Sequence, residues 1–123
     1  MLNLIKEKFD IIIIGAGLSG LILADEISKK TEKSILIIEK KKKIGYEKNW
    51  CFWNKPQNIF TNKYDTSWES IKVKIDKEEI IFKENNIKYL HLKSSTFYKY
   101  MAERLERKKK IKILKGKIGR AHV

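Results

Sequence analysis

Residues 9–21 have the sequence FDIIIIGAGLSGL, and this stretch decides the fold. Its β-branched run has the length of a strand, its glycines form a G-x-G-x-x-G motif, and the apolar positions after them recur at helical spacing. A second apolar run, Ile35–Ile38, ends in Glu39 about twenty residues after the last glycine. This order of strand, glycine turn, helix, strand and acid is the pattern of a unit that binds a dinucleotide.

The glycines and the acid each have a physical role in such a site. Gly15 allows a tight turn, Gly17 lets the backbone approach a pyrophosphate, and Gly20 lets the helix pack close to the strand. The helix start offers free N–H groups to the phosphates, and Glu39 can accept hydrogen bonds from a ribose. The alternative is a glycine-rich turn between core elements, with Glu39 a solvated acid. The predicted cofactor-binding residues are Gly15, Ala16, Gly17, Leu18, Ser19, Gly20, Glu39 and Lys40.

Four lysines, Lys40–Lys43, follow Glu39 directly. They could bind the 2′-phosphate of NADP, but the Glu39 carboxylate would repel that phosphate. We therefore interpret the run as a solvated loop.

The remaining apolar runs predict a parallel sheet. Strand Phe9–Ile14 has the composition of a strand buried on both faces. Helix Leu18–Lys30 leads to strand Ile35–Ile38, which a right-handed crossover makes parallel to the first. Ile111–Leu114 is expected as a third parallel strand. The predicted fold class is α/β, a Rossmann-like FAD/NAD(P)-binding βαβ unit with an inserted β-hairpin, in an incomplete domain.

Two helices have amphipathic spacing. The first is expected to bury Leu18, Leu21, Ile22 and Ile27 and to expose Asp25, Glu26, Lys29 and Lys30. The second begins at Ser94 or Ser95, runs to about Lys109, and is expected to bury Phe97, Met101 and Leu105, with Ala102 beside them.

Alternation between the helices predicts β-structure. Trp68–Phe82 has the pattern of a hairpin that turns at Asp76–Glu79, with apolar and polar side chains on opposite faces. Asn85 and Asn86 form a second turn, and Tyr89–Lys93 is a further strand.

The segment Trp50–Trp53 holds three aromatic residues and Cys51. In an extended segment Trp50 and Phe52 would face one side, and Cys51 and Trp53 the other. One interpretation is a core plug, and the other is a wall of the cofactor or substrate cavity, because aromatic side chains suit an apolar or conjugated ligand. The sequence leaves both open.

Composition limits the function classes. The chain has 123 residues, a net charge of +13, one Cys and two His, so it forms no internal disulfide, and a structural zinc site is not expected. Of the 28 basic residues only three are Arg, and specific nucleic-acid readers rely on Arg, so we expect no nucleic-acid partner. A basic surface could instead favour an anionic membrane face. No segment has the length and composition of a transmembrane helix or a secretion signal.

The last six residues, IGRAHV at 118–123, are what a widely used sequencing adapter encodes in one frame. We expect them to be an artefact and residues 1–117 to be the N-terminal part of a cofactor domain, with the start of a substrate-domain β segment at about 64–93. We therefore expect the chain alone to be inactive.

Several motifs together resemble the N-terminal part of the flavin-dependent lycopene cyclases. They are FDIIIIGAGLSGL, ILIIEK, KNWCFW, W-x-x-I-x-V and YLHLKSSTF, and they cover about residues 9–105. The aromatic motif is the most restrictive of them, and Asn49 stands where that family often has Thr. The resemblance does not reach the family's later acidic motif, so the catalytic acid–base group is unknown.

The resemblance implies an FAD enzyme that cyclises the ends of lycopene or a related linear carotenoid without net redox change. The flavin would act in reduced form, with NAD(P)H as electron donor, and Trp50, Phe52 and Trp53 would lie near the flavin or the polyene. It also implies a cytoplasmic protein, peripheral on the inner face of the membrane. The alternatives are a general FAD-dependent oxidoreductase or monooxygenase and a non-enzymatic Rossmann nucleotide-binding module.

Overall fold

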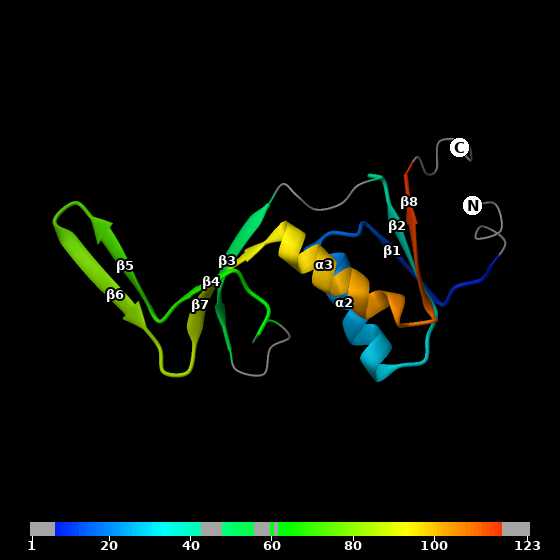
Figure 1. Cartoon of the computed structure of the whole chain (residues 1–123), viewed down its shortest axis with the longest axis horizontal. Helices are drawn as coiled ribbons and strands as arrows, with labels where there is room; N and C mark the ends of the chain where they lie inside the picture. Colours follow the sequence, from blue (N-terminus) through cyan, green and yellow to red (C-terminus); the bar gives the residue numbers. More distant parts are fainter. Residues whose placement is uncertain (1–6, 43–47, 56–59, 61, 117–123) are drawn as a thin grey trace. The chain divides into compact units, whose positions relative to one another are not determined.

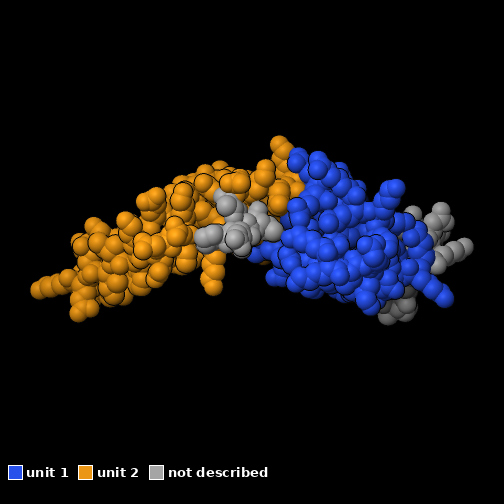
Figure 2. Space-filling model, turned by 90° about the horizontal axis from the view of Figure 1, so that it is seen from below, with its two compact units in different colours: residues 1–45, 101–123 blue, residues 46–100 orange. Residues whose placement is uncertain are grey.

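A computed structural model describes residues 7–42, 48–55, 60 and 62–116. Residues 1–6, Lys43 of the lysine run and the tail 118–123 lie outside the described residues. The chain divides into two compact units, residues 1–45 with 101–123 and residues 46–100 (Figure 2). Each unit is described by itself below.

The first unit contains a three-stranded parallel sheet with the order β1-β2-β8 (Figure 1). The strands are β1 (Ile11–Ile14), β2 (Ile35–Glu39) and β8 (Ile111–Lys115), and helix α2 (Leu18–Lys30) packs against β1 and β2. Both pairings are parallel. The predicted βαβ unit and its third parallel strand are confirmed, although β1 begins two residues later than expected.

Burial across this sheet is uneven. The central strand β2 is covered on both faces, since Ile35, Leu36 and Ile37 are all buried. The prediction of two-sided burial for β1 is wrong, because Ile12 is 56% exposed and Ile14 is 77% exposed. Ile12 and Ile14 lie on the same face of β1, opposite the buried Ile13, so one face of this strand is exposed among the described residues.

Helix α2 has the predicted bounds but a different buried face. Leu21, Ala24 and Asp25 are its buried residues, while Leu18, Ile22 and Ile27 are partly exposed. The prediction that Asp25 faces water is therefore wrong.

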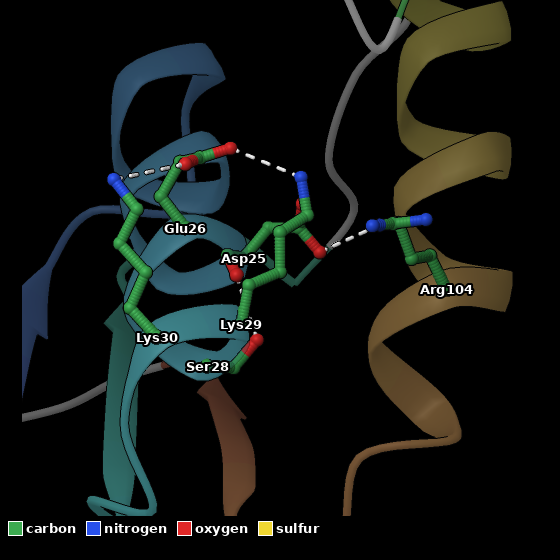
Figure 3. A network of polar contacts seen from close by, with 6 residues as sticks. All are labelled: Asp25, Glu26, Ser28, Lys29, Lys30 and Arg104. Atoms are coloured by element: carbon green, nitrogen blue, oxygen red, sulfur yellow. Dashed lines mark hydrogen bonds and ion pairs between the residues drawn. The ribbon is translucent and has the colours of Figure 1, made fainter.

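Asp25 is buried because it forms an ion pair with Arg104 of α3 (Ser94–Glu106) (Figure 3). The Nε of Arg104 donates to Oδ1 of Asp25 at 2.6 Å, and Nζ of Lys29 lies 3.2 Å from Oδ2. A buried carboxylate with two cations keeps its charge compensated without water.

The second unit is antiparallel. Its sheet has the order β3-β7-β4, formed by β3 (Asn49–Asn54), β7 (Lys88–Lys93) and β4 (Thr66–Trp68). A separate two-stranded hairpin consists of β5 (Ser70–Ile75) and β6 (Glu78–Lys83). The predicted hairpin is confirmed, except that Trp68 belongs to β4.

The predicted turns have the expected backbone. Asp76 has φ 53° and Asn86 has φ 64°, which is the left-handed region that Asp and Asn tolerate best after Gly. Asp76 joins β5 to β6, and Asn86 lies in the turn that Glu84 and Ile87 close by a β-bridge.

The apolar face of α3 is as predicted, because Phe97, Met101 and Leu105 are all buried. Two details differ. Ala102 is exposed, and the helix ends at Glu106 because Lys108 donates its N–H to Leu105 in a turn that leads into β8. The Ser94 hydroxyl accepts the N–H of Lys48, so it ties the start of the helix to the approach to β3. In the described part of the chain, no helix has the length and hydropathy to span a membrane.

Replacing Arg104 by Met should destabilise the chain by about 3 kcal/mol, because Asp25 would stay buried with only Lys29 as its counter-charge. Urea denaturation measures this loss. Lys99→Met is the matched control, since Lys99 is exposed on the same helix and should change stability by less than about 0.5 kcal/mol. The double variant Asp25→Leu/Arg104→Met should recover part of the loss. Equal stabilities of Arg104→Met and Lys99→Met would contradict the assigned role of the pair.

Candidate cofactor-binding site

The glycine turn follows β1 directly and has the geometry that the motif predicts. Gly15 has φ +102°, a conformation that L side chains rarely adopt. Its N–H donates to the carbonyl of Ile38 at 2.7 Å, so the turn begins where the pairing of β1 with β2 ends. The chain then enters α2 at the carboxyl edge of the sheet, which is where ligands bind in open α/β folds.

Gly20 is required by packing. A Cβ on Gly20 would collide with the carbonyl oxygen of Gly15 and would lie 3.3 Å from Cγ2 of Ile13. The first turn of α2 can approach β1 this closely only without a side chain at that position.

Gly17 is different, because a Cβ there would meet nothing within 4 Å. Gly17 caps α2 in an extended conformation without a side-chain hydrogen bond, and the first N–H groups of a helix have no partners within it. Open space beside free N–H groups and the positive end of a helix is a place where phosphate oxygens bind.

The carboxylate of Glu39 joins this turn to the end of β2. Oε1 accepts the N–H of Ala16 at 3.0 Å, and Oε2 accepts the N–H of Lys41 at 2.8 Å. The Lys41 N–H, more than the Ala16 N–H, lowers the pKa of Glu39 below its ordinary value, although partial burial opposes the shift. Each oxygen accepts one of these N–H groups and has a second lone pair, so the group can also accept from a ribose diol.

The structure therefore brings the predicted cofactor residues together at one edge of the sheet. Ala16 is fully buried, Leu18 is partly exposed, and Ser19 and Lys40 are exposed. Lys40–Lys42 are solvated, in agreement with the loop interpretation, and Lys43 lies outside the described residues. This arrangement fits the pyrophosphate and adenosine ribose of a dinucleotide such as FAD.

The aromatic segment forms β3, and its side chains alternate as predicted. The ring of Trp50 lies 5.5 Å from that of Phe97, and the ring of Phe52 lies 5.6 Å from that of Phe60, between ring centres. Leu90, which pairs with Phe52, is buried in the same cluster. Trp50 and Phe52 are half-buried and thus pack against the apolar core of the second unit.

Trp53 faces the other side of the sheet, in a row that crosses three strands. It pairs with Tyr89, which pairs in turn with Trp68 of β4. The Trp53 and Tyr89 rings lie 5.2 Å apart, the Trp68 and Tyr89 rings 6.2 Å apart, and the two Trp side chains are 37% and 44% exposed. We call these three residues the aromatic row.

Sequence reasoning placed Trp53 near a ligand but missed Tyr89 and Trp68 as its neighbours. Alternation in residues 88–93 indicates the face on which Tyr89 lies, but strand pairing determines what it meets. Beside the row, Nε2 of His91 lies 2.8 Å from Oδ1 of Asn49, so His91 has a partner on the surface of the strand. Among the described residues no three His, Cys, Asp or Glu side chains lie together as metal ligands.

Comparison with solved structures supports the class of fold. PqsL, described as a probable FAD-dependent monooxygenase from Pseudomonas aeruginosa, matches 87% of this chain with a TM-score of 0.65 and 16% sequence identity. The match covers 32% of the PqsL chain, so this chain spans about a third of that structure. No curated protein matches the chain. The fold is an α/β fold of the Rossmann type, and this chain spans only part of the matched structure.

The family follows from the sequence itself. The protein-family model described as "Lycopene cyclase protein" matches residues 10–122 of this chain. The chain belongs to the lycopene cyclase family.

Gly17→Val and Gly20→Ala should separate binding from folding. Gly17→Val should leave the unfolding temperature close to that of the parent chain, because its side chain enters open space, but should lower FAD affinity by at least tenfold. Gly20→Ala should destabilise the fold by about 1–3 kcal/mol through its backbone collision. Thermal unfolding without FAD and fluorescence titration with FAD measure the two effects. Undiminished FAD affinity of a folded Gly17→Val protein would contradict the pyrophosphate assignment.

Glu39 gives the site a dependence on pH. Because its pKa is lower in the folded chain, the carboxylate stabilises the fold above the ordinary glutamate pKa, about 4.3, and this stabilisation is lost as the pH falls through the lowered value. Urea denaturation at a series of pH values should show a weaker acid dependence for Glu39→Gln than for the parent chain. Glu103→Gln, at an exposed position of α3, is the control and should follow the parent chain. Identical profiles for all three proteins would contradict the two N–H contacts.

Proposed function

We propose that the protein is an FAD-dependent carotenoid cyclase that closes rings at the ends of lycopene or a related linear carotenoid. The observation that carries this proposal is the family match over residues 10–122. The geometry of the glycine turn supports the cofactor, and the exposed aromatic row supports an apolar, conjugated substrate.

In the cofactor part of the proposal, Gly17 and the N–H groups of the first turn of α2 would hold the FAD pyrophosphate. Glu39 would accept hydrogen bonds from the ribose hydroxyls while it holds Ala16 and Lys41 in place. When bound in reduced form, with NAD(P)H as electron donor, FAD would supply an electron-rich ring that can stabilise positive charge on a polyene. In this proposal the described residues bind and orient the nucleotide. We assign the acid–base group to none of them.

In the substrate part, the aromatic row provides an apolar surface for the polyene. Trp53, Tyr89 and Trp68 offer neighbouring ring faces and edges on the exposed side of β3, β7 and β4. Trp50 and Phe52 act indirectly, because their packing against Phe97 and Phe60 fixes β3 and so holds Trp53.

We also infer a cytoplasmic protein that works at the inner face of a membrane. A linear carotenoid is a hydrocarbon and dissolves in the bilayer, so its enzyme must reach it there. The net charge of +13 favours an anionic surface.

The test is expression of the intact gene product that carries this chain in a lycopene-accumulating host. The protein should purify yellow and release flavin on denaturation, and chromatography should show cyclised carotenoids. Glu39→Ala should weaken FAD binding by about 10- to 100-fold, because hydrogen bonds to a charged group contribute about 1.5–3 kcal/mol.

Two results would contradict the proposal. Unchanged lycopene in a host that makes the flavin-loaded protein would contradict the cyclase activity. It would favour a general FAD-dependent oxidoreductase, such as a monooxygenase. NADP in place of FAD at Gly15–Gly20 would show that Lys40–Lys43 had been misinterpreted. The 123-residue chain alone should convert no lycopene, and cyclised product from it would contradict the expectation that it is an inactive part.

A further inference from the structure

One face of the β3-β7-β4 sheet ends in two polar side chains. Residues opposite each other in an antiparallel pair share a face, so Asn54 at the end of β3 shares a face with Lys88 at the start of β7 (Figure 1). The next pair on this face is Phe52 with Leu90, and Leu90 is buried in the apolar core. The face therefore changes from apolar to polar within one pair of residues.

A hollow of about 590 Å³ lies at this polar end of the face. Its described lining includes three amides, two ammonium groups and a phenol, which belong to Asn54, Asn62, Asn86, Lys55, Lys88 and Tyr64. Leu90 adds an apolar side chain. All of these residues belong to the second unit. The volume is within the range of small-molecule sites, about 300–1,000 Å³.

The side-chain amide of Asn54 indicates that the hollow holds a ligand. Asn54 is 8% exposed, yet its Oδ1 has no hydrogen-bond partner among the residues that the structure describes. A buried carbonyl oxygen without a partner is costly, because folding has removed its water. Since Asn54 lines the hollow, a hydroxyl or N–H group of a molecule bound there can donate to Oδ1.

The two lysines indicate the charge of that molecule. Lys55 and Lys88 are exposed side chains of the lining, and no carboxylate belongs to the described lining. Glu84, the acid nearest to Lys88 along the chain, lies in the turn before β7 and outside this lining. A phosphate monoester carries a charge of about −1.5 to −2 at neutral pH, so one such group can neutralise two ammonium groups. A carboxylate carries only a single charge.

The amides indicate the rest of the molecule. A phosphate group alone occupies only a small part of the 590 Å³. The amides of Asn62 and Asn86 and the Tyr64 hydroxyl can each donate and accept hydrogen bonds, as sugar hydroxyls do. A hydroxyl can also donate to Oδ1 of Asn54, which a fully ionised phosphate cannot do. The lining therefore suits a phosphate group attached to a sugar.

We infer that this hollow binds a sugar phosphate, either free or as part of a nucleotide. In this assignment Lys55 and Lys88 bind the phosphate, and Oδ1 of Asn54 accepts a hydrogen bond from a sugar hydroxyl. The inference is independent of the proposed function, because it uses neither the glycine turn nor a carotenoid.

Titration calorimetry of the FAD-loaded intact protein with ribose 5-phosphate tests the inference, because bound FAD occupies the glycine turn. Lys55→Gln/Lys88→Gln should weaken binding by at least about tenfold, since it removes two charged partners of the phosphate. Lys83→Gln/Lys99→Gln is the matched control, because it makes the same change of charge at two exposed lysines outside the lining. Its affinity should stay within about twofold of the parent protein.

Asn54→Leu tests the buried oxygen separately. Leu has the same branching as Asn and no polar atom, so this variant should bind ribose 5-phosphate at least about fivefold more weakly. Its unfolding temperature without ligand should equal or exceed that of the parent protein, because the unpaired acceptor is gone. Unchanged binding by the folded Asn54→Leu protein would overturn the role of Asn54 and leave its Oδ1 to a water molecule.

Adenosine 5′-monophosphate, ribose and inorganic phosphate distinguish the sources of the ligand. Tighter binding of adenosine 5′-monophosphate than of ribose 5-phosphate would support the inference and assign the hollow to a nucleotide. Equal affinities for these two would support it and assign the hollow to a sugar phosphate. Ribose and inorganic phosphate should each bind at least about tenfold more weakly than ribose 5-phosphate.

Three results would overturn the inference, with circular dichroism and FAD titration verifying that each variant is folded. The first is the absence of saturable binding of both phosphorylated compounds by the parent protein at millimolar concentration. The second is equal affinity for inorganic phosphate and ribose 5-phosphate, which would indicate an adventitious ion only. The third is equal loss of affinity in the two double-lysine variants, which would assign the binding to net charge instead of to the hollow.

Discussion

The cofactor site depends on one carboxylate that connects two loops. Glu39 accepts the N–H of Ala16 from the turn after β1 and the N–H of Lys41 from the loop after β2. Both loops emerge at the same edge because β1 and β2 are parallel and in register. With the turn held in this way, the N–H groups at the start of α2 are preorganised for an anion, and the same acid remains available to a ribose. A single ionised side chain therefore has a structural role, and we propose that it also binds the ribose.

The helices are positioned by a second charged group that the sequence pattern did not reveal. Asp25 lies on α2 among residues whose spacing suggests a solvated face, yet it is buried against Arg104 of α3. The two residues are 79 positions apart, and the ion pair ties α2 to the C-terminal part of α3. Met101 and Leu105 provide the apolar packing of that part, and the buried pair favours one registration of the two helices over its neighbours.

The sequence predicts local structure well where one segment determines it. The turn at Gly15, the bounds of α2, the hairpin turn at Asp76 and the buried stripe of α3 follow from glycine chemistry and periodicity. Features that depend on distant partners could not be predicted. The burial of Asp25 requires Arg104, and the exposure of Ile12 and Ile14 arises because one face of β1 is uncovered among the described residues. The aromatic row exists only because Trp53 and Trp68 both pair with Tyr89. For the site the same division holds, since spacing predicts the glycines and Glu39 as cofactor-binding residues. The contacts of Trp50 and Phe52 with Phe97 and Phe60 depend on distant segments, so the sequence leaves them open.

The central claim is that the turn at residues 15–20 and Glu39 form the nucleotide-binding site of a family member that uses FAD. The most direct measurement is amide hydrogen exchange of the intact protein with and without FAD. The account predicts that FAD slows exchange at residues 16–21 and 39–41, where phosphate and ribose would replace water as partners of these groups, and leaves residues 70–83 unchanged. Tight FAD binding with unaltered exchange at residues 16–21 would contradict the claim.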